Sequence, residues 1–356
     1  MADGGEDAAL DGSSVPDAPP SDSGLAMTSF AFVGCNRLEK ADWDAVGNPS
    51  SANLPQLTQT LADLAATSPL PALFFMTGDL VLGLSDTPTL SAQLAAWTPL
   101  WKSAAPTTLV PLPGNHEMLV KQKVNGSTVE VSNPGAGAAW TQWLSASGFG
   151  GLAGNGPTMG SDPGDALKDD QSALSYSFDK GDVHFVLLNT DTWTSTVDAA
   201  TLTKIGWVPL AWLKKDLAAA QANAGVSAIF VLGHKPLVSP DGDTAYDATI
   251  EASLVPALEQ LFDATPKVKA YLAAHAHLWD AQKLPGTRGV YQIVAGNGGS
   301  APAGSWANPF FGFTEVRVYA NGSVGVVSHE RPVPAPYSSA AVVKAVAGAE
   351  LVIAGP

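Results

Sequence analysis

The chain has 356 residues, a length that suits one large α/β domain or about two smaller ones. Hydrophobic residues make up 46% of it, which is enough to bury a substantial core and excludes global disorder. Its 18 Lys and Arg against 33 Asp and Glu give a net charge of −15, which disfavours a protein that binds nucleic acid or an anionic membrane through charge. One cysteine allows no internal disulfide and no cysteine-rich zinc module, and no run reaches the roughly 18 apolar residues of a transmembrane segment.

Residues 1–27 differ in composition from the rest, being rich in Gly, Ser, Pro and acidic residues and free of basic ones. Such a segment buries too little apolar surface to offset the entropy of ordering, so we expect a disordered tail. It resembles the spacer that follows the cleavage site of exported proteins, which favours a periplasmic, secreted or lipid-anchored protein whose targeting segment is absent from this chain. We expect residues 28–335 to form one domain and residues 336–356 to form a C-terminal extension that packs on it.

From residue 29 onward, short apolar runs alternate with segments of helical periodicity, as in an α/β fold. The runs predict strands at 29–33, 72–76, 108–112, 184–188, 228–232, 268–273, 289–295, 312–319 and 324–329. Leucines spaced three or four residues apart predict helices around 54–64, 210–217 and 250–261. Asn321-Gly322 predicts a hairpin between the last two strands. Residues 121–171 show no clear pattern and are predicted to form a long functional or mobile loop.

Polar residues of the kinds that bind metals follow five of the apolar runs. The segments are FAFVGCNR (30–37), LFFMTGD (73–79), LVPLPGNHE (109–117), IFVLGH (229–234) and YLAAHAH (271–277). Ligands of open α/β sheets bind outside the carboxyl ends of the strands, so we expect these side chains to meet at one edge. The side chains concerned are those of Asp79, Asn115, His116, His234, His275 and His277. They include four of the six histidines of the chain. The sequence therefore predicts a metal site at this edge.

One carboxylate, one amide oxygen and several imidazoles suit zinc, manganese or iron better than calcium. His275 and His277 would share a face on an extended strand, whereas on a turn each could serve a different ion. Gly78, Gly114 and Gly233 permit sharp turns before the polar residues. The chain contains neither a nucleotide-binding P-loop motif nor the G-x-S-x-G motif of serine hydrolases.

The motifs GD, GNHE, GH and AHAH, in this order and spacing, resemble those of the calcineurin-like metallophosphoesterases, and the segments 176–190, 211–220 and 294–300 resemble the purple acid phosphatase branch. The resemblance extends over about residues 30–331. It implies a four-layer α/β/β/α fold, in which helices flank two stacked mixed β-sheets. It also implies hydrolysis of a phosphomonoester or phosphodiester by a water that one or two divalent ions (Zn, Mn or Fe) activate.

By this resemblance, Asp79 would bridge two metal ions. One ion would be completed by Asn115, His234 and His275, whereas His277 would belong to the other. His116 would lie beside the leaving group as general acid or charge stabiliser, and Glu117 would orient the loop that carries His116. The loop at 121–171 and the region of Trp306 would determine substrate choice, and Trp279 could also line the cleft. His184 and His329 are interpreted as structural residues.

The chain departs from the family pattern at its first motif, Asp-x-His, where it has Cys35-Asn36-Arg37. Leu82 stands where purple acid phosphatases have a tyrosine. Cys35 or Asn36 could replace the missing ligands, or Arg37 could supply fixed positive charge that contacts phosphate. An alternative interpretation is therefore a catalytically impaired relative that binds metal or phosphate. A second alternative is a scaffold that binds a partner through its acidic tail.

Overall fold

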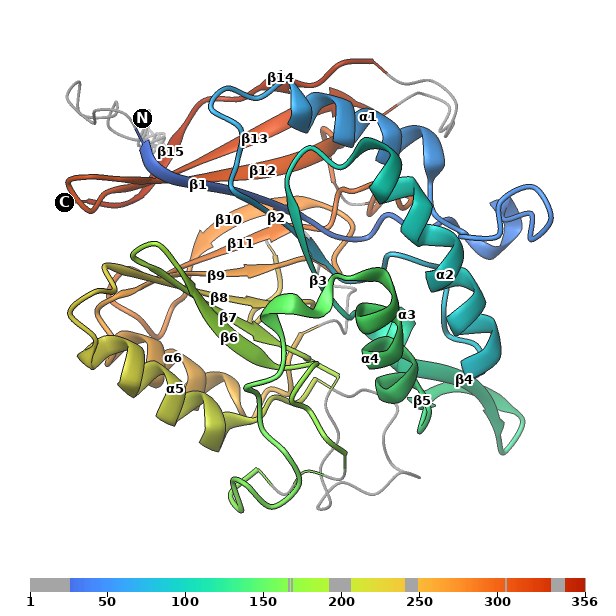
Figure 1. Cartoon of the computed structure of the whole chain (residues 1–356), viewed down its shortest axis with the longest axis horizontal. Coiled ribbons are helices and arrows are strands. Elements are labelled where there is room, and N and C mark those ends of the chain that lie inside the picture. The colour runs from blue at the N-terminus through green and yellow to red at the C-terminus, as the bar shows by residue number, and fades with distance from the viewer. Residues whose placement is uncertain are drawn as a thin grey trace, which may run out of the picture.

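Two stacked β-sheets form the centre of the molecule (Figure 1). The computed structural model describes residues 26–165, 167, 169–191, 206–240, 249–304, 306–333 and 343–355. The first sheet has seven strands in the order β14-β13-β12-β1-β2-β3, and β15 also pairs with β13. Its strands are β1 (Ala26–Val33), β2 (Leu73–Thr77), β3 (Thr108–Leu112), β12 (Phe310–Tyr319), β13 (Val324–Pro332), β14 (Val346–Ala347) and β15 (Leu351–Ala354).

The second sheet has six strands in the order β10-β11-β9-β8-β7-β6. They are β6 (Tyr176–Lys180), β7 (Val183–Leu188), β8 (Ala228–Gly233), β9 (Val268–Ala273), β10 (Trp279–Lys283) and β11 (Tyr291–Ala295). Strands β1, β2 and β3 are parallel to one another, and so are β7, β8, β9 and β11. β2, β7 and β8 are buried along their whole length, as expected for parallel strands that are covered on both faces.

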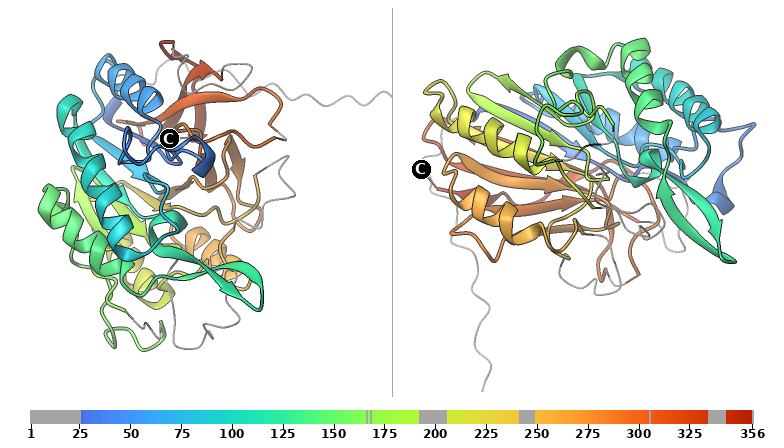
Figure 2. Two further views of the ribbon diagram at one scale, coloured as in Figure 1. Left: turned by 90° about the vertical axis from the view of Figure 1, so that its right-hand side faces the viewer. Right: turned by 90° about the horizontal axis from the view of Figure 1, so that it is seen from below.

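Helices cover the outer face of each sheet, which gives four layers (Figures 1 and 2). The first sheet is covered by α1 (Leu54–Ala65), α2 (Thr87–Ala104) and α4 (Ala136–Ser147), and the second by α5 (Leu210–Ala222) and α6 (Val255–Asp263). The short elements are η1 (Lys40–Asp42), α3 (Asn115–Met118) and η2 (Gly150–Leu152). A separate hairpin of β4 (Leu119–Val124) and β5 (Ser127–Ser132) projects from the body in Figure 1. The predicted α/β/β/α architecture is confirmed.

An aromatic cluster fills the space between the two sheets. The ring of Phe30 lies 4.9 Å from that of Phe185 and 4.9 Å from that of Phe230, both with edge-to-face geometry. All three side chains are fully buried. Phe30 comes from the first sheet, and Phe185 and Phe230 come from the second. These aromatic contacts therefore stabilise the packing of one sheet on the other.

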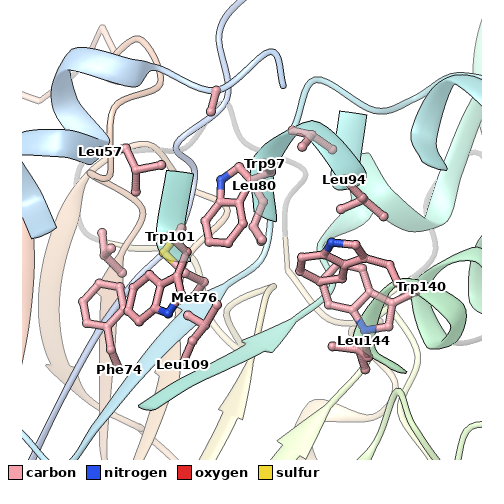
Figure 3. Packing of buried hydrophobic residues seen from close by; sticks show 14 of the residues in the cluster. Leu57, Phe74, Met76, Leu80, Leu94, Trp97, Trp101, Leu109, Trp140 and Leu144 are labelled. Atoms are coloured by element: carbon pink, nitrogen blue, oxygen red, sulfur yellow. The ribbon is translucent and has the colours of Figure 1, made fainter. Parts of the chain in front are cut away.

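A second core, between the first sheet and its helices, is rich in tryptophan (Figure 3). Trp101 of α2 stacks on Phe74 of β2 with ring centroids 5.6 Å apart. Trp140 of α4 contributes to the same core and is fully buried. The N-terminus of α2 is capped by Asp86, whose side chain accepts a hydrogen bond from the backbone N–H of Thr89 at 2.9 Å. This cap and the core fix where the loop after β2 enters the helix layer.

All nine predicted strands are present, with ends shifted by at most a few residues. The predicted helix around 250–261 begins later, as α6 at Val255. The prediction of one irregular loop over 121–171 is wrong, because this stretch contains most of β4, all of β5, α4 and η2. The predicted disordered tail lies almost wholly outside the described residues, and β1 begins at Ala26. Within the part of the chain that the structure describes, no helix has the length and apolar character needed to cross a bilayer.

Candidate metal centre

The carboxyl ends of parallel strands from both sheets converge on one rim of the molecule. β1 leads into Cys35-Asn36-Arg37, β2 into Asp79, and β3 into Asn115 and His116 on α3. From the second sheet, β8 leads into His234, and β9 leads into His275 and His277. Five strands that are distant in sequence thus deliver their terminal side chains to a common place, as the sequence predicted.

Two groups of donor atoms at this rim share one carboxylate. The first consists of Asp79, His234 and His275, and the second of Cys35, Asp79 and His277. Within each group, the atoms able to bind a metal all lie within 4.8 Å of one another. Asp79 is 1% exposed and Cys35 and His234 are fully buried, so the shared carboxylate is almost sealed from solvent.

His234 organises the first group. Its Nδ1 donates a hydrogen bond to the carbonyl of Thr77 at 2.7 Å, because a carbonyl can only accept. The opposite nitrogen, Nε2, then faces Asp79 Oδ1 at 3.2 Å and Asn115 Oδ1 at 3.1 Å. His275 Nδ1 lies 3.0 Å from the same Nε2. A second partner that fixes the ring and its tautomer in this way is typical of histidines that bind metals.

The second group is less regular. His277 Nδ1 donates to the carbonyl of Ala301 at 2.8 Å, which leaves its Nε2 for the site. The side-chain amide of Asn36 instead donates to the carbonyls of Gly298 at 2.7 Å and Asn53 at 3.4 Å. Asn36 therefore anchors the neighbouring loop, and its buried Oδ1 has no hydrogen-bond partner among the described residues.

His275 and His277 lie on a turn and not on an extended strand. His275 has φ 62°, in the left-handed region, and the backbone N–H of Ala276 donates to the carbonyl of Ala274 at 2.7 Å. The reversal sends His275 toward Asp79 and His234, and His277 toward Cys35. Of the two arrangements that the sequence allowed, the structure has the one in which the two rings serve different groups.

Arg37 and His116 flank the other side of the carboxylate. Arg37 Nε lies 3.6 Å from Asp79 Oδ2, and Arg37 Nη1 donates to Glu39 Oε1 at 2.7 Å. His116 Nε2 lies 3.9 Å from the same Oδ2, while His116 Nδ1 donates to the carbonyl of Leu82. Both side chains are about nine-tenths buried, and both border the cleft described below.

Glu117 joins the loops that follow β2 and β3. Its carboxylate accepts hydrogen bonds from the backbone N–H groups of Asp79 (3.0 Å), Leu80 (2.9 Å), Val81 (3.2 Å) and Gly114 (2.8 Å). The side chain is fully buried. This is the orienting position that the resemblance implies for Glu117, and its contacts extend to the Asp79 loop as well.

Two glycines are required because backbone and ligands approach closely. A Cβ on Gly78 would lie 2.4 Å from His234 Nδ1, and one on Gly114 would lie 2.3 Å from Asp79 Oδ1. Gly78 also has φ 91°, which side chains rarely adopt. The glycines of the GD and GNHE motifs therefore make room for the donor atoms.

Burial sets the protonation of the site. It lowers the pKa of His116 to about 3 and, together with the Arg37 charge, the pKa of His277 to about 4. Burial and the neighbouring His234 also hold the pKa of His275 well below its usual range. These three rings are therefore neutral near pH 7. Burial would raise the pKa of Asp79, but His234, whose own pKa is raised beside this carboxylate, and the permanent charge of Arg37 outweigh it, so the pKa of Asp79 lies well below its usual range and the carboxylate stays ionised.

A cleft of about 710 Å³ opens above the donor groups. Its floor includes Arg37, His116 and His277. Its walls include the β4–β5 hairpin, most of which lies in the stretch 121–171 that was predicted to determine substrate choice, and the η1 segment, for which no role was predicted. One wall is the η1 segment with Glu39, Lys40 and Trp43, and the other is the β4–β5 hairpin with Lys121 and Glu130. Trp279 and Trp306 are not among the residues that line it; both contact Phe310 instead.

The donor set fits a divalent cation. His234 Nε2 lies 3.0 Å from His275 Nδ1, 3.2 Å from Asp79 Oδ1 and 3.1 Å from Asn115 Oδ1, so several metal-binding atoms surround one point. An ionised, buried carboxylate and an amide oxygen complete this group. Imidazole and carboxylate donors suit zinc, manganese or iron.

Comparison with known proteins points to one family. A model of calcineurin-like phosphoesterases matches residues 31–278. The fold is similar to that of a dimetal phosphatase from Danio rerio, with a TM-score of 0.54 and 13% identity over 92% of this chain and 99% of the other. It is also similar to a purple acid phosphatase from yellow lupin (Lupinus luteus) seeds, with a TM-score of 0.52 and 15% identity over 92% of this chain and 55% of the other. No curated protein sequence matches the chain.

Proposed function

Since the chain belongs to the calcineurin-like phosphoesterase family, and is thereby a metal-dependent phosphoric ester hydrolase, we propose that the rim of five strand ends is its active site. The observation that carries this proposal is the position of Asp79, whose carboxylate belongs to both donor groups. We propose Asp79, Asn115, His234 and His275 as the ligands of a principal metal ion. Together with the shared Asp79, Cys35 and His277 form the second donor group.

When bound, the metal supplies positive charge to the phosphoryl oxygens and makes a water molecule more acidic. The protein's own contribution begins with orientation, because His234 and His277 are each fixed by a backbone carbonyl. The phosphate of the substrate lies on the cleft floor, between Arg37 and His116. Arg37 is permanently charged and offers planar N–H donors, which suit phosphate oxygens.

We propose that His116 assists departure of the leaving group. Its Nδ1 proton is held by the carbonyl of Leu82, so Nε2 carries a proton only in the imidazolium form. Burial disfavours that form in the free protein, as the lowered pKa shows. A phosphate dianion in the cleft favours the imidazolium, which can then donate its Nε2 proton to the departing oxygen.

The cleft walls support a role in substrate choice. Trp43 is fixed by a hydrogen bond from its indole N–H to the carbonyl of Asn48 at 2.7 Å. On the wall formed by the β4–β5 hairpin, Lys121 pairs with Glu130 at 3.8 Å. We propose that these walls, and not the region of Trp306, contact the alcohol part of the ester.

A test compares hydrolysis of p-nitrophenyl phosphate and bis(p-nitrophenyl) phosphate by metal-loaded and chelator-treated protein. We expect hydrolysis of at least one ester, its loss after chelation, and a large decrease in His116→Ala. The matched control is His329→Gln, because His329 stacks on Phe313 and pairs with Glu315 outside the site. Equal inactivity of wild type and His116→Ala with both esters and each of Zn²⁺, Mn²⁺ and Fe²⁺ would exclude hydrolysis and favour the metal- or phosphate-binding relative.

A further inference from the structure

We propose, on the basis of the proposed function, that the protein holds a single metal ion and that the Arg37 guanidinium replaces the second cation as a fixed phosphate contact. The two donor groups share Asp79, but they differ in the charge of the side chains beside them. In the second group a cationic side chain already faces the shared carboxylate.

The two oxygens of Asp79 have different partners. Oδ1 lies 3.2 Å from His234 Nε2 and accepts a hydrogen bond from the backbone N–H of His116 at 3.2 Å. Oδ2 instead faces Arg37 Nε at 3.6 Å and His116 Nε2 at 3.9 Å. One oxygen is therefore directed to the imidazoles of the first group, and the other is directed to the guanidinium.

A second cation would have to share Oδ2 with Arg37. The guanidinium keeps its charge at any pH at which the protein is folded. Its side chain is only 9% exposed, so water screens little of the repulsion between it and a neighbouring ion. The remaining donors of the second group are one thiol and one imidazole, which are too few to hold a divalent ion against that charge.

Arg37 is held in position and has a donor to spare. Its backbone pairs with Ala52 in an isolated β-bridge, and its carbonyl accepts a hydrogen bond from Ser300 Oγ at 2.9 Å. Glu39 binds Nη1 at 2.7 Å. The buried Nε has no hydrogen-bond partner among the residues that the structure describes. A buried N–H without a partner is costly, and an oxyanion in the cleft would satisfy it.

Metal content tests the stoichiometry. Wild-type protein is loaded with excess Zn²⁺ or Mn²⁺, separated from free ions by gel filtration, and analysed by elemental mass spectrometry. We expect about one ion per chain. Arg37→His removes the fixed charge and adds an imidazole, so this variant should bind nearly two metal ions per chain. Arg37→Lys keeps the charge and should still bind about one ion per chain. Arg288→His is the control, because Arg288 is exposed and pairs with Asp263 away from the site.

Each outcome decides between the two proposals. About two ions per wild-type chain would overturn the single-ion inference and leave the proposed function standing. A content near zero would overturn both. If Arg37→His still binds about one metal ion per chain, the guanidinium does not exclude the second ion, and the proposal that Arg37 replaces that ion is overturned.

Phosphate binding tests the contact itself. Calorimetry with inorganic phosphate and metal-loaded protein should show Kd raised roughly tenfold or more in Arg37→Ala, since a charge-assisted hydrogen bond is lost. Circular dichroism and the metal content of the same sample show whether this variant is folded and loaded. An unchanged Kd in folded, loaded Arg37→Ala would overturn the phosphate contact.

Discussion

Gly114→Ala tests whether the spacing between strand ends determines metal binding. The added Cβ would lie 2.3 Å from Asp79 Oδ1, 2.7 Å from the Asp79 backbone nitrogen and 2.9 Å from His234 Cε1. Gly114 has φ −104° and ψ −175°, a conformation that alanine adopts without strain. The substitution therefore acts through steric contact alone.

The size of the effect follows from these distances. Ordinary Cβ contacts begin near 3.4 Å, so the Asp79 carboxylate must retreat by about 1 Å, and the backbone behind it by somewhat less. Overpacking of this kind costs about 1–3 kcal/mol of the free energy of unfolding. A displacement of about 1 Å at a reacting centre lowers activity on the order of 100-fold. We expect both effects, together with a decrease in metal ions per chain.

The assay measures three quantities on one preparation: urea unfolding of metal-free protein, ions per chain, and kcat/KM for p-nitrophenyl phosphate. Gly151→Ala is the matched control, because a Cβ at Gly151 meets nothing within 4 Å. If Gly114→Ala keeps wild-type metal content and its kcat/KM stays within twofold of wild type, close approach at this glycine does not position Asp79.

Three further predictions address single groups. Asp79→Asn should remove most of the bound metal, since both donor groups lose their carboxylate; unchanged elemental analysis would contradict this. His116→Ala should keep the metal but lower kcat by about 10²–10⁴, and a smaller loss with both esters would rule out proton donation. Although burial lowers the pKa of His184, the carboxylates of Asp216 and Asp179 raise it above its usual value. The stabilisation is full below about pH 6.5 and is lost as the pH rises through the raised pKa, so the pH dependence of unfolding should flatten in His184→Gln; an identical profile would refute this.

The strands could be predicted from the sequence because parallel strands buried on both faces are continuous apolar runs. The same pattern predicted which side chains converge, since polar residues directly after such runs lie at the rim. The β4–β5 hairpin was missed, although its signal is present. Asn125-Gly126 joins the two strands, with φ of 50° and 86°, in the way that was recognised only at Asn321-Gly322. The hairpin contributes a cleft wall and lies mostly in the stretch 121–171, so the omission concerned its secondary structure and not its expected place beside the substrate.

Other features of the site could not be read from the sequence, because they depend on contacts between distant segments. Arg37 follows β1, and the sequence alone allowed it to be either a solvated charge or a phosphate contact. Its position against Asp79 Oδ2 arises only when the ends of β1 and β2 lie side by side. The ion pair between Arg37 and Glu39 could not be predicted either, because two residues separated by one position do not always pair. In the structure, this half-exposed carboxylate holds the guanidinium at the cleft floor.

Unusual backbone conformations position three of the residues in the donor groups. Cys35, Asp79 and His275 all have positive φ (58°, 56° and 62°), a conformation that costs non-glycine residues roughly 1–2 kcal/mol each. Two hydrogen bonds from the loop after β1 to the loop after β2 offset part of this strain: the N–H of Cys35 donates to the carbonyl of Gly78 and that of Asn36 to the carbonyl of Asp79, both at 3.0 Å. Cys35 and Asp79 are therefore fixed by contacts between the two loops that carry them. These contacts within the chain hold part of the geometry, and a bound ion would add to the stability of the fold by mass action.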